Sequence, residues 1–288
     1  TDGHAPLRVA GCRPLRALEH QLPVASAQLV AAIALAALAA DGTTRIVSPG
    51  PTRDHTERLL AAMGVAIHRE ANATTLKGPA TPHALSLRVP GDPSAAAAWL
   101  VAATVHPDAD LTLTDVAINP TRLAVVDALR EMGADITVMP KDVDGPEPVG
   151  DVRVRTARRL EPLRLDGARV PALIDELALL GVAMAAAEGE SELRGAAELR
   201  VKESDRVAST VAGLAAIGAR VEELPDGWRV RRGRAADASV LTHGDHRIAI
   251  AFAVAALAGV AGEVRLDDPA CVSVSYPSFW DDMAVVAG

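Results

Sequence analysis

The segment from residue 198 to residue 206 concentrates charged side chains that could do chemistry. Its charged residues include Arg200, Lys202, Glu203, Asp205 and Arg206. Lys202 and Arg206 are four positions apart, so a helix would place both on one face, and Glu203 lies three positions before Arg206. A carboxylate held beside two cations could bind a phosphate group and move a proton. A surface network of salt bridges would have the same sequence pattern.

Two further clusters occur where polar residues lead into apolar segments. In the first, Asp175 and Glu176 enter an apolar run, where an acid favours a helix N-terminus and could cap it. Asp175 could also act as a base toward a sugar-like hydroxyl. In the second, Thr-His-Gly-Asp-His-Arg ends with Arg247 on a first helical turn, where the helix dipole disfavours a cation. We therefore expect an anionic partner for Arg247, supplied by the protein or by a ligand.

Two sites nearer the N-terminus could hold an anion. Ser26 is placed to cap a helix, and its hydroxyl could donate to a phosphate together with the N–H groups of Ala27 and Gln28. An ordinary N-cap before a core helix would have the same sequence. In Pro-Thr-Arg-Asp-His-Thr-Glu-Arg, Thr52 or Asp54 could cap a second helix, with Arg53 directed at an anion or simply part of a solvated charged face.

The elements that would position these residues are repeated along the chain. Four Ala-rich segments begin at Ser26, Ser94, Ile174 and His246. Each is apolar nearly all round, which predicts a helix buried on every side. If these helices start at one face of their domain, their N-termini focus positive potential there, which suits anionic ligands.

A short β-like run follows each buried segment, and a more amphipathic helical stretch comes next. Three of these stretches end in Met-Gly or Ile-Gly, at Gly64, Gly133 and Gly218, and glycine just past a helix is a stop signal. The predicted unit is a buried helix, a strand, an outer helix and further strands, an α/β building block seen four times. Pro and Gly interrupt the pattern near residues 88–93. We expect residues 1–88 to be an incomplete first domain and residues 89–288 a domain of three units.

Composition excludes several classes of protein. The 288 residues are 49% hydrophobic, with a formal charge of −8, which argues against a basic face that binds nucleic acid. The two cysteines have no CxxC spacing, so we expect no disulfide framework, no metal site and a reducing cytoplasm. The apolar stretch from Leu29 to Ala40 is too short to span a bilayer, and we interpret it as a buried helix.

Seven segments, in order, resemble the 5-enolpyruvylshikimate-3-phosphate synthase family. They are LPVASAQ (22–28), PTRDHTERLLAAMG (51–64), GDPSAAA (91–97), PALIDEL (171–177), ELRVKESDR (198–206), HGDHRIA (243–249) and SVSYPSFWDDM (273–283). The resemblance implies an α/β (α+β) fold of two domains, each built from three βαβαββ units that bury their helices. It also implies transfer of the enolpyruvyl group of phosphoenolpyruvate to shikimate 3-phosphate, a step toward aromatic amino acids that glyphosate inhibits, without a cofactor or a metal.

The resemblance implies a role for each matching residue. Shikimate 3-phosphate would be bound by Ser26, Ala27, Gln28 and Arg53. Asp175 would contact the shikimate hydroxyl as an acid or base, Lys202 would contact the shikimate and the reacting centre, and Glu203 would move the proton at the methylene group. Arg206 and Arg247 would hold the phosphate and carboxylate of phosphoenolpyruvate. The partners implied are these small molecules, not nucleic acid or a membrane.

The chain also departs from the family pattern. Motifs of the family's N-terminal third have no counterpart here, and Val274 stands where many members have a lysine. Three alternatives remain: an enzyme or part of one, a catalytically incompetent anion-binding scaffold of the same fold, and the related UDP-N-acetylglucosamine enolpyruvyl transferase. The KESDR and HGDHR strings favour the shikimate branch. An incomplete domain should expose apolar surface, so we expect self-association or a complementing N-terminal segment.

Overall fold

The computed structural model describes Pro6 and residues 8–288. The chain forms two compact units, one of residues 1–88 with 144–147 and one of residues 89–143 with 148–288.

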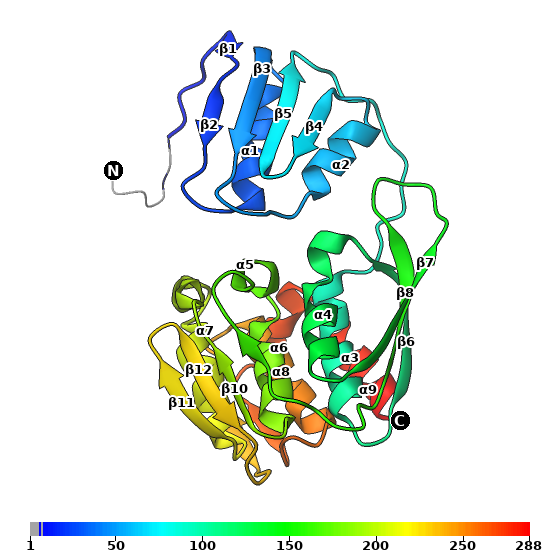
Figure 1. Ribbon diagram of the computed structural model, residues 1–288, viewed down its shortest axis with the longest axis vertical. Helices are drawn as coiled ribbons and strands as arrows, with labels where there is room; N and C mark the ends of the chain where they lie inside the picture. The colour runs from blue at the N-terminus through cyan, green and yellow to red at the C-terminus, as the bar shows by residue number, and fades with distance from the viewer. Residues whose placement is uncertain (1–5, 7) are drawn as a thin grey trace. The chain divides into compact units, whose positions relative to one another are not determined.

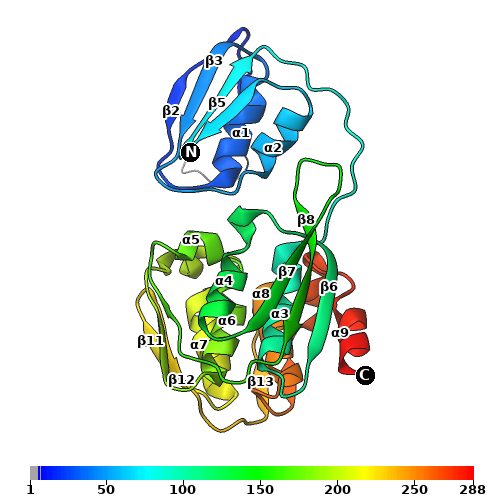
Figure 2. The ribbon, with the colours of Figure 1, turned by 45° about the vertical axis from the view of Figure 1, so that its right-hand side comes forward.

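The first unit is one mixed sheet with two helices on one of its faces (Figure 2). Strand order is β1-β3-β5-β4, and β2 also pairs with β3. The elements are β1 (Leu15–Arg16), β2 (Glu19–Gln21), α1 (Ala27–Ala37), β3 (Ala40–Val47), α2 (His55–Ala62), β4 (Ile67–Glu70) and β5 (Ala73–Gly78). One apolar core joins both helices to the sheet, and it includes Val30 and Ala34 of α1 and Leu60 of α2.

Helix α1 is not buried on every side, so that prediction and the interpretation of residues 29–40 as a buried helix are wrong. Only Val30, Ala34 and Ala37 are buried in α1, while Leu29 and Leu35 are 38% and 56% exposed. The physical reason is that α1 packs one face on the sheet, and no described element of this unit covers its other face. The helix also ends at Ala37, because the chain turns there into β3.

Three helices form the core of the second unit: α3 (Pro93–Val105), α6 (Leu177–Ala186) and α8 (His246–Leu257). They pack on one another, and nearly all of their residues are buried. A small residue also lets the outer helix of residues 206–216 approach α6, since a Cβ on Gly181 would lie 3.2 Å from a methyl of Thr210. The prediction of helices buried on every side is therefore confirmed for these three segments.

Sheets and outer helices surround this helical core (Figure 1). The sheets are ordered β6-β8-β7, β11-β12-β10-β9 and β13-β14. The strands are β6 (Asp110–Ala117), β7 (Asp135–Lys141), β8 (Val149–Arg155), β9 (Arg164–Leu165), β10 (Glu190–Leu193), β11 (Arg220–Leu224), β12 (Gly227–Arg231), β13 (Ala238–Val240) and β14 (Val264–Leu266). The other helices are α4 (Ala124–Glu131), α5 (Val170–Leu173), α7 (Arg206–Ala216) and α9 (Phe279–Ala287), with 3-10 turns η1 (Pro120–Arg122), η2 (Ala197–Val201) and η3 (Pro269–Val274).

The glycine stops predicted for the outer helices are confirmed at the ends of α2, α4 and α7. Gly64, Gly133 and Gly218 have positive φ of 82°, 96° and 93°. After each glycine, the next backbone N–H returns to a carbonyl five residues earlier, as when Val65 donates to Leu60. This hydrogen-bond pattern ends a helix where a left-handed residue is required.

Candidate active site

The N-termini of α3, α6 and α8 meet at one face of the second unit, as expected from the repeats. Ser94, at the start of α3, donates from Oγ to Glu176 Oε1 at 2.5 Å, and Glu176 directly precedes α6. Arg247, on the first turn of α8, acts electrostatically on the same carboxylate. Three partially positive helix ends therefore converge, which favours anions at this face.

Glu176 is the buried centre of this face, and its carboxylate does not cap α6 as the sequence suggested. Burial raises its pKa, the hydrogen bond from Ser94 opposes the shift, and the charge of Asp175 adds to it. Arg122 Nη2 donates to Ser94 Oγ at 2.7 Å and to Asp92 Oδ1 at 2.9 Å. Sequence reasoning missed Ser94 and Arg122, because the partners Ser94 and Glu176 are separated by 82 positions.

The raised pKa of Glu176 gives a testable pH dependence. The folded chain holds this proton more tightly than the unfolded chain, so the carboxyl's contribution to stability is fully present below its ordinary pKa of 4.5 and is lost as pH rises through the folded-state value. Gln at this position still accepts from Ser94 but cannot ionise. We expect the melting temperature of Glu176→Gln to fall less than that of the wild type between about pH 5 and pH 8.

The control for this measurement is Glu263→Gln, which changes a carboxylate that is 66% exposed. Its melting profile against pH should follow the wild type. Superimposable profiles for Glu176→Gln and the wild type would show that Glu176 does not titrate differently in the folded chain.

Asp175 lies half-buried in the turn between α5 and α6, next to Glu176. The turn follows the short helix α5 and leads into α6, so Asp175 stands at the mouth of a buried helix, as predicted. The negative charge of Asp175 raises the pKa of Glu176, so the two carboxylates lie at the same helix end.

The segment around Lys202 differs from the sequence prediction. Lys202 follows η2 in an extended conformation, and α7 begins only at Arg206. Lys202 and Arg206 therefore do not share a helix face, because Asp205 caps α7 by accepting from the N–H of Ala208 at 3.0 Å and starts the helix there. Lys202 Nζ instead forms an ion pair with Glu198.

Glu203 and Arg206 are brought together, as their spacing suggested. Arg206 Nη2 donates to Glu203 Oε2 at 2.6 Å, and the Glu203 side chain is 56% exposed. This carboxylate is thus held by a cation while it remains accessible, which is a geometry that suits a proton carrier.

Arg206 is mostly buried through a partner that sequence reasoning missed. Its Nε donates to Asp245 Oδ2 at 2.7 Å, and the two side chains are 4% and 0% exposed. Asp245 also accepts from Ser204 Oγ and from the backbone N–H of Arg247, so it caps α8. Burial opposes ionisation of Asp245, but the ion pair with Arg206 and these hydrogen bonds outweigh it and lower its pKa. The HGDHR motif therefore stabilises the fold, because its Asp245 forms a buried ion pair and caps α8.

Arg247 has an anionic neighbour in Glu176 but keeps an unsatisfied donor. Its Nε is buried, and no hydrogen-bond partner lies within reach among residues 8–288. Burial, and then the charge of Arg247, lower the pKa of His246 beside it. A buried guanidinium N–H without a partner is costly. The protein itself therefore supplies only part of the anionic partner that we expected for Arg247.

In the first unit, the other predicted binding residues lie at one edge of the sheet. Ser26 caps α1 by accepting from the N–H of Leu29 at 3.4 Å, which confirms the predicted cap. Ala27 begins α1, and Gln28 follows it with its side chain exposed. The N-terminus of α1 therefore presents N–H groups that an anion could accept.

Arg53 reaches the same edge, because β2 and β3 are parallel and their carboxyl ends coincide. The loop after β2 leads to Ser26, and the loop after β3 leads to Arg53. The loops touch, since a Cβ on Gly50 would lie 3.5 Å from the Cβ of Ala25. Asp54 stands at the N-cap of α2 without a side-chain cap bond, so the predicted capping by Thr52 or Asp54 is not observed.

In the described part of the chain, no group of three or more His, Cys, Asp or Glu side chains is arranged to hold a metal ion. No helix there is both long and apolar enough to cross a membrane.

Known proteins resemble this chain over nearly its whole length. The profile of the family EPSP synthase (3-phosphoshikimate 1-carboxyvinyltransferase) matches residues 1–283. A 3-phosphoshikimate 1-carboxyvinyltransferase of Roseiflexus castenholzii is 50% identical over 96% of this chain and 64% of its own length. One of Chloroflexus aurantiacus is 46% identical over 99% of this chain and 66% of its own length. The chain therefore spans 64% to 66% of the length of these curated relatives.

Solved structures of enolpyruvyl transferases also resemble this chain. An EPSP synthase from Acinetobacter baumannii superposes with a TM-score of 0.86 at 38% identity, over 95% of this chain and 63% of that one. The enolpyruvyl transferase NikO from Streptomyces tendae superposes with a TM-score of 0.64 at 20% identity, over 86% of this chain and 56% of that one, which shows a shared fold.

Proposed function

This chain belongs to the EPSP synthase family, and we propose that it acts in the transfer of the enolpyruvyl group from phosphoenolpyruvate to shikimate 3-phosphate. The observation that carries the proposal is the unsatisfied, buried Nε of Arg247 at the convergence of three helix N-termini. An anionic ligand at this face would satisfy that donor and would be favoured by the helix dipoles.

The proposed reaction has two steps, and each removes one proton and adds one. In the first, the shikimate hydroxyl loses its proton and forms a C–O bond to the enol carbon, while the methylene group gains a proton and becomes a methyl. In the second, the methyl loses a proton, the double bond reforms and the C–O bond to phosphate breaks, and the leaving phosphate takes up a proton. The reaction needs two proton carriers and positioned cations, but no change in oxidation state.

We assign the proton at the methylene group to Glu203, because its carboxylate is exposed and held by Arg206 at 2.6 Å. We assign contact with the shikimate hydroxyl to Asp175, which stands half-buried at the mouth of α6. Lys202, whose side chain is 28% exposed, would contact the shikimate and the reacting centre.

The anionic groups of the substrates would be bound by the helix ends and by arginines. Arg206 and Arg247 would hold phosphoenolpyruvate. Ser26, the N–H groups of Ala27 and Gln28, and Arg53 would bind the phosphate of shikimate 3-phosphate. This second assignment is supported by the α1 N-terminus and the Arg53 loop lying at one sheet edge.

The test is a calorimetric titration of the purified chain with shikimate 3-phosphate, followed by phosphoenolpyruvate and an assay of phosphate release. Binding with release is the expected result for an active enzyme. Binding without release would limit the chain to an anion-binding role. Failure to bind either substrate would overturn the proposal.

We further propose that residues 1–88 are part of the family's N-terminal domain and residues 89–288 its C-terminal domain of three βαβαββ units. The three buried helices α3, α6 and α8, each followed by a strand and an outer helix, support the second assignment. The free cysteines Cys12 and Cys271 are compatible with a reducing cytoplasm, where we place the protein.

We also propose that the exposed apolar face of α1 associates with a second copy or with a complementing segment. Leu35 on this face is 56% exposed, and Leu29 is 38% exposed. Light scattering at high concentration should give a mass above the 29.8 kDa of one chain, and Leu35→Glu should lower it. Leu59→Glu, at a 40% exposed leucine of α2, is the matched control. A monodisperse wild-type monomer would contradict this proposal.

A further inference from the structure

Glu203, the proposed proton carrier, lies in a short segment with little backbone support. Residues 202–204 join the end of η2 to the N-cap of α7. Within the described chain, Glu203 and Ser204 make no backbone-to-backbone hydrogen bond. Such a segment adopts many conformations unless its two ends are fixed by other contacts. The position of the Glu203 carboxylate therefore depends on what holds the residues at either end.

Arg200 holds one end through four hydrogen bonds, each of 2.8 Å. Its Nη1 donates to Asp205 Oδ2, and its Nη2 donates to Glu223 Oε1. Its Nε donates to the carbonyl of Pro225, and its Nη2 also donates to the carbonyl of Leu224. A guanidinium is planar and holds its donors in a fixed fork, so these four acceptors also fix its orientation.

The bond from Arg200 to Asp205 closes a loop of the chain around two residues of the candidate site. Asp205 also caps α7 by accepting from the N–H of Ala208 at 3.0 Å. The last turn of η2 is therefore joined to the first turn of α7, and Lys202 and Glu203 lie between the joined residues. Closing a short loop in this way reduces the number of conformations open to it.

The turn between β11 and β12 is the base to which this loop is attached. The turn supplies two backbone carbonyls to Arg200. The carboxylate of Asp226 in the turn accepts from the N–H of Gly195 at 2.8 Å, and its carbonyl accepts from the N–H of Ala196 at 2.7 Å. The same turn thus holds the chain before η2 directly and the start of α7 through Arg200.

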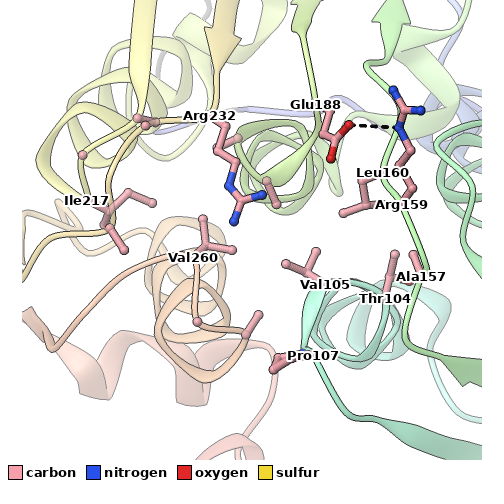
Figure 3. A pocket seen from close by; sticks show the side chains of 18 of the residues that line it. Thr104, Val105, Pro107, Ala157, Arg159, Leu160, Glu188, Ile217, Arg232 and Val260 are labelled. Carbon is pink, nitrogen blue, oxygen red and sulfur yellow. Dashed lines mark ion pairs between the residues drawn. The ribbon is translucent and has the colours of Figure 1, made fainter.

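Arg159 shows how this arrangement differs from an ordinary surface ion pair. Figure 3 shows Arg159 beside Glu188, at a cavity lined by the C-terminal ends of α3 and α6. Its Nε lies 3.0 Å from Glu188 and 3.1 Å from Glu161, and its side chain is 63% exposed. The side chain of Arg200 is only 26% exposed. Exposed pairs such as those of Arg159 contribute little to stability.

We propose that Arg200 is a positioning residue for enolpyruvyl transfer, because it holds residues 202–204 where the Glu203 carboxylate can exchange a proton with the substrate. This inference rests on the role proposed above for Glu203. Arg200 itself donates to four acceptors of the protein and is not assigned to a substrate. Arg206 and Arg247 lie outside the closed loop, so the binding of phosphoenolpyruvate depends little on Arg200.

Arg200→Gln is expected to lower kcat by about 10- to 100-fold, because a displacement of about 1 Å is enough to slow catalysis on this scale. The KM for phosphoenolpyruvate should change much less. Arg159→Gln, the matched control with two carboxylate partners, should leave both constants unchanged. Arg200→Lys should recover little of kcat, because an ammonium has no fork that reaches four acceptors at once. Phosphate release measures both constants.

A second measurement does not depend on turnover. The heteronuclear ¹H–¹⁵N NOE of the Glu203 and Ser204 amides should fall in Arg200→Gln, because the segment gains motion on the picosecond-to-nanosecond timescale. It should keep the wild-type value in Arg159→Gln. The midpoint of urea denaturation should change little in Arg200→Gln, since Asp205 keeps its cap bond to Ala208. The change is then confined to the segment.

Three outcomes would overturn the inference: an unchanged kcat in Arg200→Gln, an unchanged NOE in the same variant, and full recovery of kcat by Arg200→Lys. A wild-type chain that binds neither substrate would instead contradict the proposed function. In that case the NOE measurement by itself decides whether Arg200 holds residues 202–204.

Discussion

Replacing Arg206 with methionine is expected to lower the free energy of unfolding by about 3–5 kcal/mol, since removing one partner of a buried ion pair leaves the other charge uncompensated. The partner here is Asp245, whose side chain is fully buried. Methionine fills similar space but supplies no donor to Asp245 Oδ2. Urea denaturation followed by circular dichroism measures the effect.

A double variant separates loss of charge compensation from loss of packing. In Arg206→Met with Asp245→Asn, the amide oxygen still accepts from the N–H of Arg247, and the amide nitrogen can donate to Ser204 Oγ, but no buried charge remains. More than half of the lost stability should return. As a control, Arg265→Met breaks an exposed pair with Glu263 and should cost less than about 1 kcal/mol. A loss this small for Arg206→Met itself would show that the buried pair contributes little.

Replacing Arg247 with glutamine is expected to weaken ligand binding and to leave the stability of the fold nearly unchanged, in contrast to Arg206→Met. Phosphoenolpyruvate affinity should fall by about 10- to 150-fold, which corresponds to the loss of one charged hydrogen bond worth about 1.5–3 kcal/mol. The free energy of unfolding should change by less than about 1 kcal/mol, because the buried Nε has no partner to lose among the described residues. Calorimetric titration and urea denaturation of the same preparation measure both quantities.

Gln28→Ala is a useful comparison for Arg247→Gln, because Gln28 belongs to the proposed shikimate 3-phosphate site. Its substitution should weaken binding of shikimate 3-phosphate more than the intrinsic binding of phosphoenolpyruvate. If Arg247→Gln instead leaves the affinity for phosphoenolpyruvate unchanged, the proposed assignment of this guanidinium to phosphoenolpyruvate fails.

The contrast between these two arginines shows what sequence reasoning could and could not assign. Both were expected to bind phosphoenolpyruvate, because both lie in charged motifs before or within a helix start. The structure gives Arg206 two carboxylate partners and leaves Arg247 Nε with none in the described chain. The partner that makes the difference for Arg206, Asp245, is 39 positions away. Motif spacing does not reveal such a pair.

The sequence by itself determined the features that depend on neighbouring residues. Helix stops at Gly64, Gly133 and Gly218 follow from the left-handed conformation that glycine adopts without strain. The cap at Ser26 follows from a side-chain oxygen within reach of the next turn. The all-round apolar pattern of α3, α6 and α8 predicted their burial, because such a surface is stable only away from water.

Only the tertiary structure decided features that depend on which elements pack together. The same apolar pattern in α1 gave one buried face, since burial requires partners on every side. Lys202 does not share a helix face with Arg206 as expected, because Asp205 caps α7 and the helix begins after Lys202. The contact of Ser94 with Glu176 joins positions that are 82 apart. Such contacts are set by the close packing of distant segments, which local pattern does not specify.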